Sequence, residues 1–336
     1  MPFRDAIVVI GDINVDVLGA VDRWPQPGDD CLAPHLEMHL GGVGANCAIA
    51  LSRWGIRPRL VGSVGQDEFG KFVRRILREQ GLEVQWIQST SAAMTGLFYI
   101  NVTPDGQRTF FGSRGANMLV RKPPRPHVLF HRAAALHLVG YDFLTPIMEA
   151  TARYLHKSLR DRGAFLSLDV GPEPSRLIPR KLLQLASQVD ILFANRAESF
   201  SLTQEHDPCN ALRSLLNSGA KDVALKLGKD GCLIFHEGAV KQVPPFLVKV
   251  VDSTGAGDAF VAAFLQARLR GWSHPEAALA ANAAGAAAGK IVGAGENLPH
   301  VRDIVRVLQN PLSDPEWDMV RRNILAKAQS AKRLFR

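Results

Sequence analysis

Cysteine is scarce in this sequence. The 336 residues contain four cysteines, and none of them belongs to a C-x-x-C pair. They are Cys31, Cys47, Cys209 and Cys232. A chain of this size with so few, widely spaced cysteines is unlike a secreted domain built on a disulfide framework. We therefore expect reduced thiols and a cytoplasmic protein.

Long hydrophobic runs are absent as well. The first apolar run, residues 6–11, ends at Asp12 and is too short for the core of a signal peptide. The Ala-rich stretch 277–289 is interrupted by Asn282 and is too short to cross a bilayer. We expect no membrane-spanning segment and no membrane partner.

Acidic residues are missing from the end of the chain, which explains most of the net charge of +8. The basic residues of this acid-free segment, 321–336, are Arg321, Arg322, Lys327, Lys332, Arg333 and Arg336. The rest of the chain is nearly neutral, so the charge indicates no nucleic-acid partner. We expect residues 311–336 to form a solvated, basic helical tail.

Two common nucleotide-binding motifs are also missing. The segment GAAAGKI (285–291) has one residue too few between its glycines for a P-loop and lacks the hydroxyl residue that holds the metal. The Gly-rich turns 42–47 and 255–260 end in Cys47 and Phe260, where the dinucleotide fingerprint requires a third glycine. Any nucleotide site must therefore use a different arrangement.

Short apolar runs alternate with helical stretches along most of the chain. Helical periodicity marks residues 67–80, 146–162 and 207–218, and glycines follow two of these stretches directly. The apolar runs are continuous, as in strands buried on both faces. They are AIVVIGD, ALHLVG, FLSLDVG, DILFAN and DVALKLG. The alternation predicts an α/β fold with a mostly parallel sheet between layers of helices.

Two segments depart from this alternation. Residues 17–40 are rich in Pro and Gly, and residues 95–112 form a predicted hairpin around Pro104-Asp105-Gly106. We expect these segments, about 17–40 and 95–115, to form a small β lid inserted in a single core domain, residues 1–310. Because its apolar strands would be exposed in a monomer, we also expect a homodimer formed through the lid.

The segment VVDSTGAGDAFVAAFLQARL (250–269) carries the strongest chemical signal. The small residues Gly255, Ala256 and Gly257 precede an apolar helix, whose first amides can then accept an anion. Asp258 in its first turn is expected to have a pKa at or below about 3.9. Such a carboxylate can orient a hydroxyl and accept its proton during phosphoryl transfer. The alternative interpretation is a helix-capping acid beside a tight turn.

Other polar residues follow predicted strands or open another helix. GGVGANCAIALSRWG (41–55) is a second Gly-rich start of a helix, GDINVD (11–16) follows the first strand, and NRAE (195–198) follows the strand ILFA. The polar residues at these positions include Asn14, Asp16, Asn46, Asn195 and Glu198. Ligands bind at the carboxyl ends of strands in α/β sheets, so these residues are expected to gather around one site.

The segments GGVGANCAIALSRWG and DSTGAGDAF resemble the two signature motifs of the ribokinase-like sugar kinases, the PfkB carbohydrate kinase family. The resemblance runs from about residue 6 to about residue 300. It implies a ribokinase-like three-layer sandwich with a lid, acting as an ATP- and Mg²⁺-dependent kinase on a hydroxyl of a small carbohydrate. It implies Asp258 as the base, and the amides of Gly255, Ala256 and Gly257 as the anion hole.

The same resemblance implies further site residues. Those matching the acceptor-binding positions are Asn14, Asp16, Gly42 and Asn46. Those matching nucleotide-binding positions are Asn195, Lys226, Gly228, Gly231 and Asn282. Glu198 matches the magnesium motif, acting partly through water. A monovalent-cation site, of the K⁺ type, matches Asp252, Thr254, Ala288, Ile291 and Gly293. The alternative for Asp252 is that it only caps a turn.

The acceptor is left open by departures from the family pattern. YDFLTP (141–146) has no glutamate where ribose-specific members place one, and Val43 stands where they carry a lysine, so these positions argue against ribose itself. The acceptor types that the resemblance implies are ribose, fructose and keto-deoxy sugar acids. Arg114 is either a ligand for a substrate carboxylate or phosphate or a solvated lid residue. The competing functions are a nucleoside kinase and a non-catalytic sugar-binding member of the fold.

Overall fold

One large sheet forms the centre of the molecule. The computed structural model describes residues 6–103 and 108–330. Over these residues the sheet has nine strands in the order β13-β12-β11-β10-β9-β8-β1-β4-β5. They are β1 (Ala6–Ile10), β4 (Arg57–Gly65), β5 (Ile87–Thr90), β8 (Ala133–Val139), β9 (Phe165–Asp169), β10 (Ile191–Asn195), β11 (Val223–Lys226), β12 (Cys232–His236) and β13 (Ala239–Val243). Neighbours run parallel from β11 to β5, whereas β12 and β13 pair antiparallel.

Strand β1 shows why the sheet lies between two layers. Ile7 and Val9 belong to one buried apolar cluster, whereas Val8 and Ile10 belong to another. Since successive strand side chains point to opposite faces, both faces of β1 are covered. This confirms the continuous apolar runs as doubly buried strands, and with them the mostly parallel three-layer α/β sandwich.

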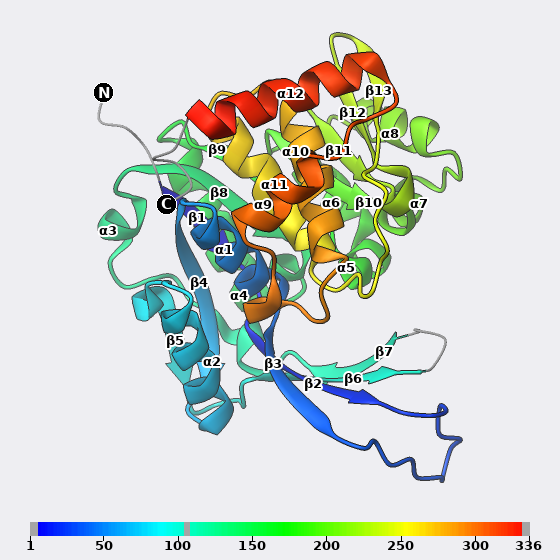
Figure 1. Ribbon diagram of the computed structural model, residues 1–336. Coiled ribbons are helices and arrows are strands. Elements are labelled where there is room, and N and C mark those ends of the chain that lie inside the picture. Colours follow the sequence, from blue (N-terminus) through cyan, green and yellow to red (C-terminus); the bar gives the residue numbers. More distant parts are fainter. Residues whose placement is uncertain (1–5, 104–107, 331–336) are drawn as a thin grey trace.

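Helices cover both faces of the sheet (Figure 1). The first face packs against α1 (Val43–Arg53), α2 (Glu68–Glu79), α9 (Ala256–Leu269), α10 (His274–Ala288), α11 (Val301–Leu308) and α12 (Pro315–Ser330). The opposite side carries α3 (Pro126–Phe130), α4 (Pro146–Arg160), α5 (Pro172–Leu177), α6 (Pro179–Ala186), α7 (Arg196–Thr203) and α8 (Pro208–Asn217). The three helices predicted from periodicity are confirmed as α2, α4 and α8. None of the helices described is both long and apolar enough to cross a membrane.

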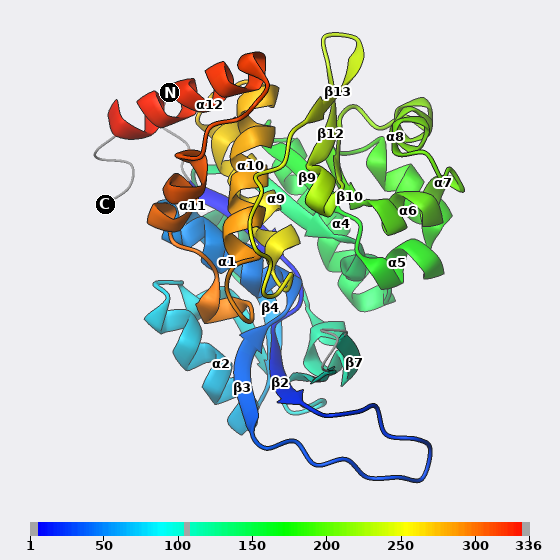
Figure 2. The same cartoon turned by 45° about the vertical axis from the view of Figure 1, so that its right-hand side comes forward.

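The lid is a separate four-stranded sheet that stands away from the sandwich (Figure 2). Its strands, in the order β3-β2-β6-β7, are β3 (Leu36–Gly41), β2 (Asn14–Ala20), β6 (Gly96–Val102) and β7 (Arg108–Ser113). Strands β6 and β7 pair antiparallel, as the predicted hairpin requires, although its turn at 104–106 lies outside the described residues. Strand β2 begins at Asn14, three residues before the predicted lid segment, so predicted acceptor residues lie on the lid itself.

The C-terminal helix α12 is part of the sandwich. Trp317 and Ile324 are buried in the same cluster as α9 and α10. Arg321 is also buried, and its Nη1 donates to the carbonyl oxygen of Leu308 at 2.9 Å. The expectation of a solvated tail is therefore wrong for residues 315–330, because the apolar residues spaced seven apart place one face of this helix against the core.

We expect Ile324→Ala to lower the free energy of unfolding by about 2–4 kcal/mol, because its side chain is 1% exposed and truncation leaves a cavity. Met319→Ala is the matched control on the same helix, since Met319 is 54% exposed and should cost under about 0.5 kcal/mol. Urea unfolding followed by circular dichroism measures both. Equal small losses would mean that α12 does not stabilise the domain.

Candidate active site

The predicted site residues gather where the parallel strands end and the helices α1 and α9 begin. Asp169, Asn195 and Lys226 are the last residues of β9, β10 and β11. Because these strands are neighbours and parallel, their last residues share one edge of the sheet. The structure therefore brings together residues far apart in sequence, as the strand-end rule predicts.

Small residues keep the N-terminus of α9 accessible. Gly255 precedes the helix with a φ of 74°, in the left-handed region, and a Cβ there would lie 2.9 Å from both Ala294 Cβ and Leu298 Cδ2. Ala256 and Gly257 line a pocket, and a Cβ on Gly257 would lie 3.6 Å from Lys226 Nζ. The partial positive charge of this helix end thus faces open space beside a lysine, as an anion-binding site requires.

Asp258 lies in the first turn of α9 and is held by Asn46. Its Oδ2 accepts a hydrogen bond of 2.8 Å from Asn46 Nδ2, and Asn46 Oδ1 accepts one of 3.0 Å from the amide of Gly295. Asn46 was predicted to bind the acceptor, and here it also orients the predicted base. Both Gly-rich motifs therefore meet at one carboxylate.

The prediction of a low pKa for Asp258 is wrong. Burial raises its pKa to about 7, with Asp169 and Asp16 adding to the shift and the Asn46 hydrogen bond and Lys226 opposing it. The helix N-terminus was expected to favour the ionised form, but desolvation outweighs that effect. A carboxylate with a pKa near 7 is a stronger base than an ordinary aspartate and still ionises in neutral solution.

Lys226 forms an ion pair that sequence reasoning missed. Its Nζ lies 2.9 Å from Asp169 Oδ1 and 3.1 Å from Oδ2. Burial opposes its positive charge, but Asp169 and Glu198 raise the pKa of Lys226 above its usual value, so the amine stays protonated. Asp169 ends the run FLSLDVG, and the strand-end rule applied to that run would have found it.

Asn195 and Glu198 cap helix α7 reciprocally. Asn195 Oδ1 accepts from the Glu198 amide at 2.9 Å, and Glu198 Oε2 accepts from the Asn195 amide at 2.8 Å. This capping box buries Glu198, and burial raises its pKa, with Asp169 adding to the shift. The motif therefore has a structural role here and also places a buried carboxylate beside Lys226 and Asp169.

The lid strand β2 carries Asn14 and Asp16, and the Asp16 carboxylate is close enough to Asp258 to add to its pKa shift. Asn14 Oδ1 accepts a hydrogen bond of 2.7 Å from Asn117 Nδ2, which the sequence reasoning did not single out. Burial raises the pKa of Asp16 to about 7. Gly42 has a φ of 96°, and a Cβ there would lie 2.4 Å from the carbonyl oxygen of Asp12, so a glycine is required where α1 meets β1.

Arg114 is not a solvated lid residue. Its Nε and Nη2 lie 2.8 Å and 2.7 Å from the two carboxylate oxygens of Asp12. The guanidinium also lies 5.2 Å from the ring centroid of Tyr141. Its predicted role as a ligand for an anionic substrate stays a prediction.

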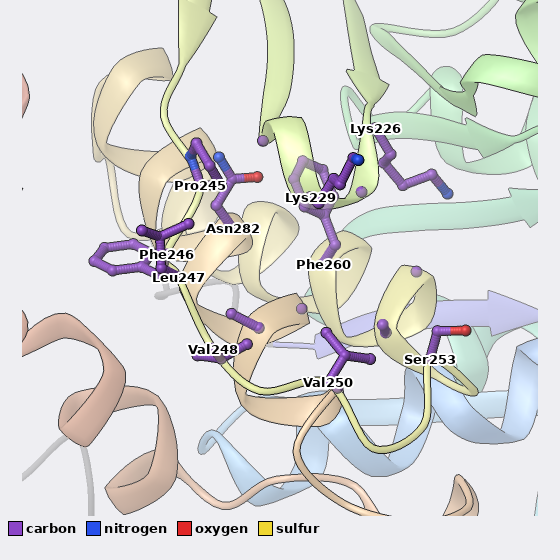
Figure 3. Close-up of a pocket in the computed structure, with 17 residues that line it drawn as sticks. Lys226, Lys229, Pro245, Phe246, Leu247, Val248, Val250, Ser253, Phe260 and Asn282 are labelled. Carbon is purple, nitrogen blue, oxygen red and sulfur yellow. The ribbon is translucent and has the colours of Figure 1, made fainter. Parts of the chain in front are cut away.

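A pocket of about 360 Å³ lies beside the N-terminus of α9 (Figure 3). Lys226 lines it from the end of β11, Gly228 and Gly231 from the loop that follows, and Asn282 from α10. Asn282 Nδ2 donates to the carbonyl oxygens of Val243 and Pro244, at 3.2 and 2.9 Å, so it also fixes the segment after β13. The apolar lining of the pocket comprises Phe246, Leu247, Val248 and Val250 from the segment PPFLVKV, and Phe260 from α9. Sequence reasoning missed the PPFLVKV residues, because this segment carries no recognisable motif.

The loop before α9 is tied to the end of α10 through Asp252. Its Oδ1 accepts from the Thr254 amide at 2.8 Å, and its Oδ2 accepts from the Gly293 amide at 2.6 Å. The amide of Ile291 donates to Ala288 in the adjoining turn. The structure thus places the predicted monovalent-cation residues in two adjoining loops and shows the turn-capping role of Asp252. Cation binding itself stays a prediction.

Solved structures of the same architecture define the class of protein. The ribokinase of Arabidopsis thaliana, solved in complex with ribose and ATP, matches with a TM-score of 0.79 and 26% identity over 92% of this chain and all of that one. A ribokinase of Haemophilus influenzae is 26% identical over 319 residues, covering 91% of this chain and 99% of the relative. Fructokinase-1 of Zea mays is 32% identical over 322 residues, covering 91% and 98%.

The match to the family itself spans most of the chain. Residues 4–301 match the pfkB family carbohydrate kinase. The chain therefore belongs to this family and is a carbohydrate kinase, a phosphotransferase with an alcohol group as acceptor. The family, the ribokinase-like fold and the enzyme class predicted from the two motifs are confirmed.

Replacing Asp258 is expected to stabilise the fold. The pKa of Asp258 is higher in the folded than in the unfolded protein, so its ionisation destabilises the folded state. This loss of free energy of unfolding grows as the pH rises from about 4 to about 7 and stays constant above pH 7. Asp258→Asn keeps an acceptor for Asn46 and should raise Tm by roughly 2–4 °C at pH 8, with the gain shrinking toward pH 4. Differential scanning calorimetry across this range measures it, and Asp161→Asn, on an exposed side chain, is the control. A gain independent of pH would contradict the raised pKa.

Proposed function

We propose that this enzyme transfers the γ-phosphoryl group of ATP to a hydroxyl of a small sugar, with Asp258 as the base. The observation that carries the proposal is the position of Asp258, which Asn46 holds directly after Gly257 of the pocket beside α9 and close enough to the lid residue Asp16 for the two carboxylates to interact. A base between two ligand sites can accept a proton from one ligand while the other supplies the phosphoryl group. Ribokinase solved with ribose and ATP supports the same pair of ligands.

The residues of the site suit a direct in-line transfer. Asp258 would accept the proton of the attacking hydroxyl, and the amides of Gly255, Ala256 and Gly257 would stabilise the charge on the transferred group. Lys226 lies beside Gly257 and supplies a positive charge next to these amides. Asn14 and Asp16, from the lid, would hydrogen-bond the other sugar hydroxyls. No covalent enzyme intermediate is needed.

The pocket beside α9 is proposed to hold ATP. Its apolar walls suit a nucleobase, with Asn282 at the base edge, while Lys226 and Gly228 would lie toward the phosphates and Gly231 would close the turn. Carboxylate oxygens are suitable Mg²⁺ ligands, and Glu198 and Asp169 would hold the ion partly through water. Bound Mg²⁺ would neutralise phosphate charge. The loops joined by Asp252 would hold a monovalent cation such as K⁺.

Ribose, fructose and keto-deoxy sugar acids are the candidate acceptors, and the ribokinase and fructokinase relatives favour the first two. A nucleoside acceptor is the second candidate, on the basis of the aromatic lid residue Phe98, which pairs with Asp16 and shares its face of the lid. Tyr99 and Phe111, the other aromatic candidates, lie on the opposite face. A cytoplasmic location is proposed with the enzyme, and the cysteines support it because all four are free.

The function is tested by measuring ADP release with ATP and MgCl₂ over a panel of pentoses, hexoses, keto-deoxy sugar acids and nucleosides, with and without KCl. We expect turnover with a sugar, and a loss of roughly a thousandfold in kcat for Asp258→Asn with little change in the affinity for ATP. Tight sugar binding without any ADP release would instead identify a non-catalytic protein. A mild loss in Asp258→Asn would exclude Asp258 as the base.

The lid also supports the proposed homodimer. Strand pairing places Met38, Val17, Tyr99 and Phe111 in one row across the four strands, on the face opposite Asp16. Phe111 is 57% exposed and stacks on Trp24, with ring centroids 5.5 Å apart. An apolar row on a thin sheet needs a cover, and a second lid would supply it symmetrically.

We expect the wild type to sediment as a dimer and Phe111→Lys to shift it toward the monomer, since the charge would enter the interface twice. Phe110→Lys is the matched control, because Phe110 is 52% exposed but lies on the opposite face of the same strand. Sedimentation velocity at micromolar concentrations distinguishes them. A monomeric wild type, or equal effects of the two variants, would rule out pairing through this face.

A further inference from the structure

Asp12 and Arg114 form a closed ion pair next to the proposed acceptor site. Two nitrogens of the guanidinium, Nε and Nη2, donate to separate carboxylate oxygens of Asp12, at 2.8 and 2.7 Å. The side chains are only 13% and 6% exposed. The Tyr141 ring lies 5.2 Å from the guanidinium carbon, and Met148 Sδ lies 3.4 Å from Nη2. Arg114 is therefore held in one orientation with its bidentate edge already occupied.

Backbone contacts connect this pair to the residues that would bind the acceptor. The carbonyl oxygen of Arg114 accepts a hydrogen bond of 2.9 Å from Asn117 Nδ2, the same nitrogen that donates to Asn14 Oδ1. The carbonyl oxygen of Asp12 accepts from the Ala45 amide at 3.2 Å, next to Asn46 at the start of α1. The ion pair thus lies between the lid strand and the helix start that frame the acceptor site.

Asp12 is the carboxylate that compensates Arg114. The nearby Asp142 is fully buried, and its Oδ2 accepts a hydrogen bond from the Val139 amide. Burial raises the pKa of Asp142 well above its ordinary value and so favours its uncharged form, with Asp12 adding to the shift and Arg114 opposing it. Asp16 and Asp258 are the acidic groups toward the phosphoryl-transfer site, and the cation there, Lys226, is already paired with Asp169. An incoming anion would meet a neutralised arginine and further acidic groups.

We infer that the Asp12–Arg114 pair determines specificity for the acceptor, selecting an uncharged polyhydroxylated sugar over a sugar acid or a sugar phosphate. An anionic acceptor would have to share Arg114 with Asp12, whose carboxylate already neutralises the guanidinium charge and would then lie beside a second negative charge. A neutral sugar brings no second negative charge to this buried pair. The inference narrows the proposed function to uncharged acceptors and rests on that function for the location of the sugar site.

The test compares the binding of uncharged and anionic ligands by isothermal titration calorimetry, which requires no turnover. The probes are ribose and fructose against 2-keto-3-deoxygluconate and fructose 6-phosphate. The wild type should bind its best neutral sugar at least about tenfold more tightly than either anion. Asp12→Asn should reduce this ratio about tenfold or more by strengthening anion binding, because it leaves the guanidinium charge uncompensated.

The double variant Asp12→Asn/Arg114→Met separates charge from structural damage. It should lose the gain in anion binding, whereas a merely loosened site would bind all ligands more weakly in both variants. Thermal unfolding verifies that each variant is folded. A wild type that binds an anion as tightly as the neutral sugars overturns the inference without any variant, and so does an unchanged ratio in Asp12→Asn. Absence of ADP release with every sugar would reject the proposed function alone, since the binding ratio is measured independently.

Discussion

The hydrogen bond between Asn46 and Asp258 is the contact on which the arrangement of the site depends. It joins the first turns of α1 and α9, which lie 212 residues apart in the chain. Asn46 uses its amide nitrogen on Asp258 and its amide oxygen on Gly295, so the orientation of this side chain is fixed from both ends. A partly desolvated carboxylate is thereby kept in one place, and the two Gly-rich helix starts are held around it.

Charge compensation is the second constraint on the site. Lys226 is paired with Asp169, and Arg114 is paired with Asp12, each through two short contacts. Buried charges without partners would be strongly destabilising, so each cation that faces a ligand site also needs a carboxylate in the absence of ligand. The two pairs differ in their surroundings. Lys226 lies beside the open N-terminus of α9, where a phosphate would add favourable interactions, whereas Arg114 lies between Tyr141, Met148 and its partner Asp12, with the buried Asp142 nearby.

Much of the fold could be predicted from the sequence, because continuous apolar strands and amphipathic helices are local signals. The strand AIVVI and the helices at 68–79 and 208–217 lie where periodicity and capping residues place them. The packing of α12 could not be read in the same way. Its positive charge suggested solvent, and only the structure shows that Trp317 and Ile324 meet the α9 and α10 layer. Composition describes a whole segment, whereas burial depends on one face of it.

The site was predictable where a motif fixes the backbone and unpredictable where side chains meet across elements. Gly255 and Gly42 follow from local geometry, so their positions were found. The pKa of Asp258 was not predicted correctly. The stabilising effect of a helix N-terminus can be recognised in the sequence, whereas the atoms that desolvate the carboxylate come from distant segments. The partner of Arg114 was not found for the same reason, since Asp12 lies 102 residues away in the chain. A single arginine in a sequence indicates affinity for anions; the same arginine beside a buried carboxylate argues for a neutral acceptor.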